Sequence, residues 1–441
     1  MKLKNLCLLL ALLLFLACSG KKSLKTDDDA QLNQLAAQYV RLGLTIGQYD
    51  PDFVDAYYGP DSLKPTTHKL PAFPKDSLLA QVNSLLTQFK AFDTPEAEPE
   101  ARTRAQWISQ QLVAFGRRIR IVSGETGTFD EESKELFGVE APHFPEGTFP
   151  KIVKQLDNLL PGAGPVQERY QKLASQFNIP KAKLDTVFKT AVAEARRRTL
   201  QHFKLPAQES FVIEYVTNKP WSGYNWYKGN LKSIIQVNTD LPKSINDAIL
   251  LACHEGYPGH HVYNALLEKN LYQDKGRLEI SLYPLFSPQS FIAEGSANYG
   301  VSVAFPAAEH QRYAREVLLP LAGLDTTHLS LYYKASALMG KLNYVRNDVG
   351  RKLLAGTISD AQAAKQLVEE GLYEKASAAK SVDFIKKYRS YVINYNYGQD
   401  LVKQYIEAQG GTASATDKRW QLFGELLSNQ VTPSQLLQQK K

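Results

Sequence analysis

Apolar residues recur at helical spacing along most of the chain. In the first such segment, Leu32, Leu35, Ala36, Tyr39 and Val40 fall on one face of a helix. The same spacing predicts helices over residues 29–44, 77–89, 98–122, 151–160 and 181–203, and again from residue 244 almost to the end of the chain. The pattern therefore predicts a mainly helical protein.

The pattern changes over residues 210–239, where β-type runs replace the helical spacing. Residues 211–216 and 233–238 are rich in β-branched and aromatic side chains, and an aromatic, turn-rich segment lies between them at 221–227. We expect a small sheet of roughly three to five strands here. The predicted fold class is mainly α with a small β-sheet (α+β). Its two lobes would be a helical N-terminal domain at 30–205 and a second domain at 206–441 that contains the sheet.

The helix predicted after the second strand is apolar on every face. Ser244 and Asp247 form a capping box at its start, with Asp in place of the usual Glu. A helix that is hydrophobic all round is buried. It runs directly into four polar side chains that can bind metals: His254, Glu255, His260 and His261. Buried polar groups are costly unless they are satisfied, and a bound cation would satisfy these.

The spacing of these side chains departs from the familiar zinc-peptidase signature, in which two His lie four residues apart with a Glu after the first. Four residues after His254 stands Pro258, which removes a helical hydrogen bond and bends the helix. Gly259 then allows conformations that other residues avoid. We expect the helix to break here and His260 to return toward His254. His261 remains the alternative to His260, since seven residues make about two helical turns.

The segment from His254 to His261 resembles the motif of a large bacterial family, DUF885, which is similar to the gluzincin metallopeptidases. Further segments that match it are residues 237–239 (Val-Asn-Thr), Glu294-Gly295 with Ala297 and Tyr299, and Arg389 with Tyr395 and Gly398. Ser296 and Val301 depart from the family pattern, in which Trp and a second acid are usual, and this bears on the substrate range. The resemblance implies a zincin-like catalytic domain within 206–441 and a zinc metallopeptidase activity.

A catalytic zinc takes three protein ligands and leaves one position for water. His254 and His260 are expected to supply two of them. Glu294 is the expected third, because it follows an apolar stretch and because Gly295 and Ala297 allow close helix packing. Taken alone, Glu294 is better explained as a solvated helix carboxylate, and the upstream motif together with the resemblance favours the ligand. Glu255, adjacent to a ligand, is the expected general base.

The oxyanion of a tetrahedral intermediate needs a donor besides the metal. The resemblance points to Arg389 and Tyr395 within the Tyr-rich stretch 388–398, although any single Tyr there can also pack in the core. Asn238 and Tyr257 are the predicted residues that bind a peptide substrate. The strand that ends at Asn238 could be an open edge that aligns a peptide by main-chain hydrogen bonds, and an internal strand fits the sequence equally well.

Composition excludes several classes of protein. The 441 residues are 44% apolar and 22% charged, which excludes a fibrous, a disordered or a multi-span membrane protein. The formal charge is +7, and without Lys2 and Lys4 it becomes 7 − 2 = +5, so we expect no nucleic-acid partner.

The N-terminus predicts export. Lys2 and Lys4 precede an apolar run at 6–16 that is too short to span a bilayer, which is typical of a signal peptide. Residues 16–19 (Leu-Ala-Cys-Ser) resemble the bacterial lipoprotein box, in which Cys18 becomes lipidated; a plain signal peptide or an anchor helix is the alternative. We expect a signal peptide at 1–17, a tether at 18–29 and a lipid anchor in the membrane of the cell envelope. Cys253 would then be the one other cysteine of the mature chain, so no internal disulfide is expected.

Together these features predict a membrane-tethered zinc metallohydrolase that hydrolyses peptides. Two other classes remain open. One is a lipoprotein that binds peptides or metal without turnover, against which the intact Glu255 argues. The other is a zinc hydrolase of a different amide or ester, for which the same side chains would serve.

Overall fold

The computed structural model describes residues 28–66, 69–219 and 221–438. The predicted signal peptide, Cys18 and the predicted tether up to residue 27 lie outside these ranges. Helices dominate, and the strands form two small sheets, so the predicted α+β class is confirmed. In the described ranges, no helix is both long and apolar enough to cross a membrane.

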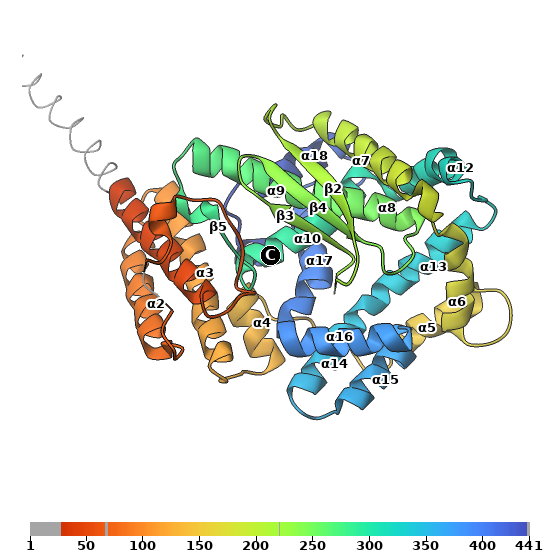
Figure 1. Ribbon diagram of the computed structural model, residues 1–441, viewed down its shortest axis with the longest axis horizontal. Coiled ribbons are helices and arrows are strands. Elements are labelled where there is room, and N and C mark those ends of the chain that lie inside the picture. Colours follow the sequence, from red (N-terminus) through yellow and green to blue (C-terminus); the bar gives the residue numbers. More distant parts are fainter. Residues whose placement is uncertain (1–27, 67–68, 220, 439–441) are drawn as a thin grey trace, which may run out of the picture.

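The first third of the chain forms a group of helices at one end of the molecule (Figure 1). These are a helix over 28–47, α2 (Lys75–Phe89), α3 (Pro99–Val122) and α4 (Phe129–Phe137). Then α5 (Thr148–Leu159), α6 (Val166–Ala174) and α7 (Leu184–Leu200) lead toward the larger sheet. All five helices predicted in this part are present, with shifted ends; residues 181–183, for example, form a 3₁₀ turn before α7.

The larger sheet has three strands in the order β2 (Ser210–Val216), β4 (Lys232–Asn238), β3 (Gly223–Tyr227). β2 runs parallel to β4, and β3 runs antiparallel to it. One expectation is corrected, since the segment interpreted as turn-rich contains the strand β3. Of the two alternatives for the strand that ends at Asn238, an open edge or an internal strand, the structure has the internal strand. The edges are β2 and β3, because each pairs only with β4 among the described residues.

A second, two-stranded sheet joins distant parts of the chain. β1 (Val54–Tyr57) pairs antiparallel with β5 (Leu282–Pro284), more than 200 positions later. The sequence analysis missed both strands. The pairing brings the segment around Asp55 against the second half of the chain, and one continuous apolar core runs through both halves.

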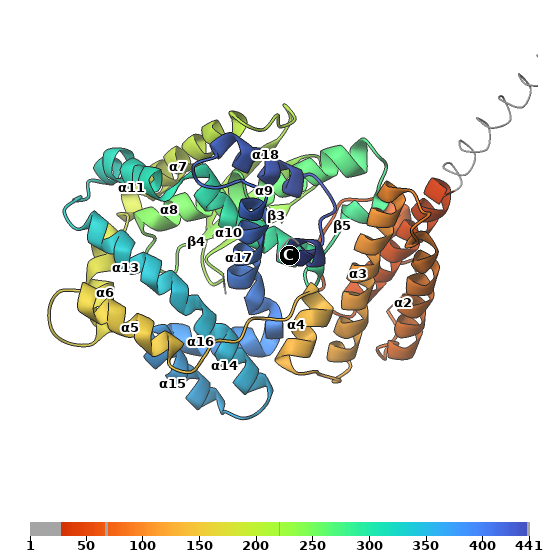
Figure 2. The same cartoon turned by 180° about the vertical axis from the view of Figure 1, so that it is seen from behind.

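The second half is helical around a central helix, α10 (Pro288–Ala304), which packs along α17 (Ile393–Ala408) (Figures 1 and 2). Before α10 come α8 (Ile245–Leu251) and α9 (His260–Leu267). The remaining helices are α11 (Ala307–Tyr313), α12 (Leu319–Ala322), α13 (Leu329–Lys341), α14 (Val345–Leu354), α15 (Asp360–Gly371), α16 (Lys375–Tyr388), α18 (Thr416–Leu427) and α19 (Pro433–Gln438).

The helices α10 and α17 cross at a pair of glycines. A Cβ on Gly295 would lie 2.5 Å from the carbonyl carbon and oxygen of Gly398, and a Cβ on Gly398 would lie 3.1 Å from the Cα of Gly295. Only hydrogen fits at both positions, so the two backbones touch. This contact holds Glu294 of α10 close to Tyr391 and Tyr395, at the start of α17.

We expect Gly295→Ala to lower the free energy of unfolding by about 1–3 kcal/mol, because the added methyl group meets backbone that cannot rotate away. Urea denaturation of the purified protein measures this. The matched control is Gly340→Ala in α13, where a Cβ meets no atom within 4 Å. There the change should be neutral or stabilising by about 0.5–1 kcal/mol, since Ala favours a helix over Gly. Equal stabilities for the two variants would contradict the glycine crossing.

Candidate active site

The apolar helix ends as the sequence predicted. α8 begins after the cap Ser244, with the capping box formed by Asp247. It widens into a π-helical turn, Ala252–Gly256, and helical structure resumes in α9 at His260. The predicted interruption at Pro258-Gly259 is confirmed. A Cβ on Gly259 would lie 2.0 Å from the carbonyl oxygen of His254, so glycine is required for this tight return.

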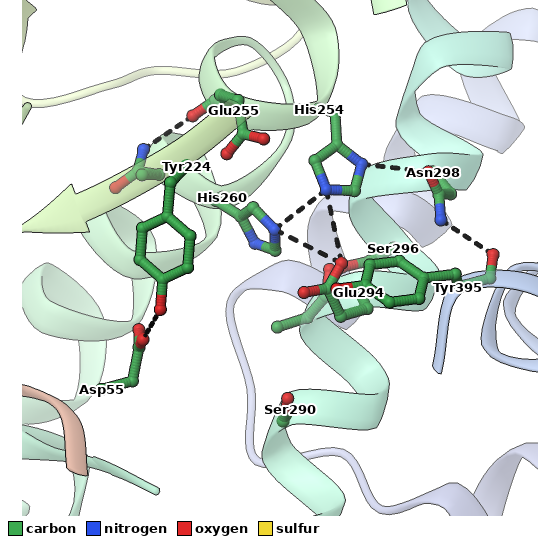
Figure 3. A network of polar contacts seen from close by, with 12 residues as sticks. Asp55, Tyr224, His254, Glu255, His260, Ser290, Glu294, Ser296, Asn298 and Tyr395 are labelled. Atoms are coloured by element: carbon green, nitrogen blue, oxygen red, sulfur yellow. Dashed lines mark hydrogen bonds and ion pairs between the residues drawn. The ribbon is translucent and has the colours of Figure 1, made fainter. Parts of the chain in front are cut away.

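The return brings two imidazoles and a carboxylate together (Figure 3). The Nε2 atoms of His254 and His260 lie 3.1 Å apart. The Oε2 atom of Glu294, from α10, lies 3.3 Å from Nε2 of His254 and 3.7 Å from Nε2 of His260. All three side chains are almost fully buried, with about a tenth of each exposed. Three atoms that favour metal coordination therefore face one point.

Electrostatics within this group are strongly coupled. Burial alone would raise the pKa of Glu294, but the two imidazoles outweigh it and hold that pKa below its usual value. Burial alone would lower the pKa of His260, but the neighbouring carboxylates, above all Glu294, raise it to about 9. The arrangement thus favours the charged forms of Glu294 and His260.

Neighbouring groups orient two of these side chains. Nδ1 of His254 donates to Oδ1 of Asn298 at 3.0 Å, which leaves Nε2 as the free lone pair toward Glu294. Asn298 in turn donates from Nδ2 to the carbonyl oxygen of Tyr395 at 2.8 Å. The hydroxyl of Tyr391 donates to Oε1 of Glu294 at 3.0 Å. Oε2 of Glu294 is buried and lacks a hydrogen-bond partner among the described residues.

Glu255 points into the same space. Its carboxylate forms a compact group with His254 and His260, whose nearest ligand atoms all lie within 4.8 Å of one another. The Glu255 carbonyl accepts a hydrogen bond from Asn225 Nδ2 at 2.7 Å, which ties this turn to β3. Burial, with a smaller contribution from Glu294, raises the pKa of Glu255, while the two imidazoles oppose the rise. A raised pKa makes this carboxylate a stronger base than an ordinary Glu.

A cavity of about 680 Å³ opens onto these groups. Asp55 of β1 and Tyr224 of β3 line the wall opposite α10, and the Tyr224 hydroxyl donates to the Asp55 carboxylate. Burial raises the pKa of Asp55 to about 6. Tyr395 lines the cavity from α17, and its hydroxyl has no hydrogen-bond partner in the described ranges. The size suits a small ligand or a few residues of a peptide.

The structure brings six of the residues considered above to this cavity: His254, Glu255, His260, Glu294, Tyr395 and the unpredicted Asn298. Asn298 could have been found, because it lies four residues after Glu294 and so on the same helical face. Asp55 and Tyr224 carry no comparable signal, since each is an ordinary polar residue in a strand. Their place depends on the pairing of distant segments.

His261, the alternative to His260, faces the opposite side of α9. Its Nδ1 lies 2.9 Å from Ser233 Oγ and its Nε2 lies 2.8 Å from Glu209 Oε2, with none of its surface exposed. Both ring nitrogens are thus engaged. Tyr257 belongs to the same cluster, because its hydroxyl donates to Glu209 Oε2 at 2.5 Å. Neither residue lines the cavity.

Arg389 and Asn238 also lie outside the cavity lining. Arg389 donates from Nε to Glu132 Oε2 at 2.5 Å and anchors the segment between α16 and α17 to α4. Asn238 donates from Nδ2 to the carbonyl oxygens of Lys219 and Trp221, each at 2.9 Å, and so holds the loop before β3. Both side chains make these structural contacts away from the cavity, so the structure gives no support to their predicted roles toward a substrate.

The residues present fit a divalent cation. Two imidazole nitrogens and one carboxylate oxygen are the donor set of a catalytic zinc site. Glu294 Oε2 is the orphaned atom that such a cation would satisfy. A second acidic group, Asp130 with Glu140 and His143, is more exposed, and Arg351 already pairs with Asp130 at 2.8 Å. The buried group is therefore the candidate metal centre.

Comparisons with known proteins show the fold but no family. No family model matches the chain, and no curated protein matches it. A candidate lipoprotein from Colwellia psychrerythraea has a similar structure, with a TM-score of 0.52 and 15% identity over 82% of this chain. This chain covers 65% of that protein's length.

Two further structures are less similar. They are an M32 carboxypeptidase from Deinococcus radiodurans R1 (TM-score 0.47, 11% identity, 94% of this chain and 95% of that one) and a candidate lipoprotein of unknown function from Shewanella oneidensis (TM-score 0.48, 12% identity, 83% and 72%). We draw no conclusion from these two. The chain shares its helical α+β fold with the Colwellia protein, and its membership of DUF885 stays a prediction.

Proposed function

We propose that the protein is a zinc metallohydrolase that cleaves peptide bonds, with Glu255 as general base. The observation that carries the proposal is the buried triangle of His254, His260 and Glu294, whose nitrogen and oxygen atoms face one point beside the carboxylate of Glu255. These three side chains would hold the ion. Zinc, when bound, supplies Lewis acidity that polarises a carbonyl and makes water a better nucleophile.

The remaining steps use groups of this chain. Glu255 accepts a proton from the attacking water at a carboxylate oxygen and passes it to the leaving nitrogen. The hydroxyl of Tyr395, which lines the cavity, is the proposed donor to the oxyanion. Arg389 lies outside the lining in an ion pair with Glu132 and is not proposed for this role. Asn298 keeps the imidazole of His254 in the correct tautomer.

The proposed substrate is a peptide because an edge strand lines the cavity. Residues Gly223 to Trp226 of β3 are part of the lining, and β3 is free on its second side within the described part of the chain. An extended peptide can add to such an edge through main-chain hydrogen bonds. The strand ending at Asn238, for which the sequence left open an edge or an internal position, is internal and does not offer such an edge.

One experiment tests the proposal. Purified protein is analysed for bound metals, then incubated with a mixture of peptides of varied length, and cleavage positions are mapped by mass spectrometry. We expect one zinc per chain and metal-dependent cleavage that a chelator abolishes. Zinc without cleavage of any peptide would favour a binding protein or a hydrolase of other amides or esters. Absence of a divalent metal, with no metal restoring hydrolysis, would overturn the proposal.

We further propose that the chain is a lipoprotein anchored through Cys18. The support is the Leu-Ala-Cys-Ser box at 16–19, after the apolar run. Replacing Cys18 by Ser should release the protein into the soluble fraction or leave an uncut precursor, because the thiol that accepts the lipid is lost. Fractionation and the mass of the mature N-terminus measure this. Normal retention of a processed Cys18→Ser variant in the membrane would contradict the anchor.

A further inference from the structure

One cation in the cavity has no counter-charge. Arg346, at the start of α14, lines the cavity, and its Nε is buried without a hydrogen-bond partner among the described residues. Its guanidinium carbon lies 5.1 Å from the centre of the Phe384 ring, which covers one face of the group. No carboxylate in the described ranges forms an ion pair with it. A buried donor of this kind requires an explanation.

Other cations near Arg346 do form ion pairs with carboxylates. Lys387, which also lines the cavity, pairs with Asp52 at 3.0 Å. On the helix of Arg346 itself, Arg351 pairs with Asp130 at 2.8 Å and Lys352 pairs with Asp348 at 2.7 Å. Lys219 also lines the cavity and forms no ion pair with a described residue, but it is exposed to solvent. Arg346 differs from it because its Nε is buried without a hydrogen-bond partner.

Arg346 lies close to the reacting groups. Phe384, under its guanidinium, packs near Tyr391, with ring centres 6.4 Å apart, and Tyr391 donates to Glu294. The charges of Glu294 and Arg346 both act on Tyr395. Burial and then Glu294 raise the pKa of Tyr395, and Arg346 opposes the rise. Two side chains thus separate Arg346 from the candidate metal ligand. An extended peptide advances about 3.3–3.6 Å per residue, so a substrate at the metal centre can reach Arg346 within a few residues.

The remaining cavity charges restrict what Arg346 can bind. Asp55, Glu255 and Glu294 carry acidic groups into the same space, Lys387 is paired with Asp52, and Lys219 is exposed, so Arg346 is the buried lining cation that can attract an anion. A guanidinium presents five N–H donors in a planar fork that matches a carboxylate with two parallel hydrogen bonds. The matching ligand chemistry is a carboxylate at one end of an otherwise neutral or cationic segment.

We propose that Arg346 binds a carboxylate of the substrate and thereby fixes which bond lies at the candidate metal centre. The inference rests on the proposed peptidase function. Two sources supply this chemistry, the C-terminal carboxylate of a peptide and the side chain of Asp or Glu. With the first source, cleavage occurs at a set distance from the C-terminus; with the second, it occurs at a set distance from an acidic residue.

The test measures binding separately from turnover. Zinc-loaded Glu255→Gln protein is titrated calorimetrically with matched peptides. One pair differs only in a free or amidated C-terminus, and a second, amidated series carries Glu or Gln at successive positions. We expect the peptide with the recognised carboxylate to bind about 10- to 100-fold more tightly than its neutral partner, the range for hydrogen bonds to a charged group.

Variants assign this preference to Arg346. Adding Arg346→Ala should reduce the ratio to near one, and added guanidinium ions should restore part of it. Adding Arg346→Lys should give an intermediate ratio, since the charge remains and the fork is lost. Lys352→Ala, on the same helix but outside the cavity lining, removes an equal charge and should leave the ratio unchanged.

Each outcome decides the proposal. A preference for free C-termini that Arg346→Ala abolishes supports it with the C-terminus as source, and a lost preference for Glu over Gln supports it with a side chain as source. Equal ratios before and after Arg346→Ala, or binding of none of the peptides, overturn it. Peptides that bind through Arg346 but are never hydrolysed by the unmodified protein would overturn the proposed function alone.

Discussion

Replacing Glu255 by Gln should reduce peptide hydrolysis by about 10²- to 10⁴-fold, the contribution of a positioned general base. Gln keeps the size of the side chain but cannot accept and return a proton. Bound zinc should remain, because the proposed ligands are His254, His260 and Glu294. Steady-state kinetics, with metal content measured on the same preparation, distinguishes the two effects.

The matched control for this result is Glu214→Gln. Glu214 lies on β2, outside the cavity lining, where its carboxylate accepts a hydrogen bond from Gln236 at 2.8 Å. The same chemical change there should leave the rate constant unaltered. If Glu255→Gln retained full activity with full zinc occupancy, the assignment of Glu255 as base would fail, and the metal centre would survive that result.

Of the paired histidines, His260 is expected to carry the metal. His260→Ala should weaken zinc binding by more than about 100-fold, because even residues that only orient a ligand contribute about 10- to 100-fold. His261→Ala should retain zinc, since both of its ring nitrogens already contact Ser233 and Glu209. Competitive titration with a zinc chelator measures both affinities.

The adjacent histidine should show its effect in stability instead. Loss of the His261 contact to the buried Glu209 carboxylate should lower the free energy of unfolding by about 1.5–3 kcal/mol, the value of a hydrogen bond to a charged group. His261→Gln, whose amide can replace Nε2 toward Glu209, should lose less. If His261→Ala lost zinc in a protein with native circular dichroism while His260→Ala kept it, the ligand assignment would be reversed.

The part of the site that lies in one stretch of sequence could be predicted. An all-apolar helix that runs into His254 and Glu255 predicts a buried polar cluster. The Pro258-Gly259 step that follows predicts a break in the helix. Both are local properties of the chain, and both are present in the structure. Glu294 lies on another helix, 39 positions after Glu255. Its own surroundings favoured a solvated carboxylate, and the upstream motif with the family resemblance was needed to predict a metal ligand.

The opposite walls of the cavity could not be predicted in this way. Asp55, Tyr224 and Arg346 come from three elements distant in sequence, and nothing in their surroundings marks them. Arg389 was predicted instead, because it belongs to the segment that resembles the DUF885 motif. In the structure its guanidinium forms an ion pair with Glu132. β3 was missed because its Gly223 and Asn225 favour a turn, and pairing with β4 overrides that preference.

The glycine crossing and the β1–β5 pairing also matter for how the protein is made. A chain synthesised from its N-terminus contains His254, His260 and Glu294 long before Tyr391, which hydrogen-bonds Glu294 from 97 positions later. Until the segment with Tyr391 and α17 has been synthesised and packs on α10, Glu294 lacks its hydrogen bond from Tyr391 and the helix that packs beside it. If the site is hydrolytic as proposed, we therefore expect nascent and C-terminally clipped chains to lack that activity.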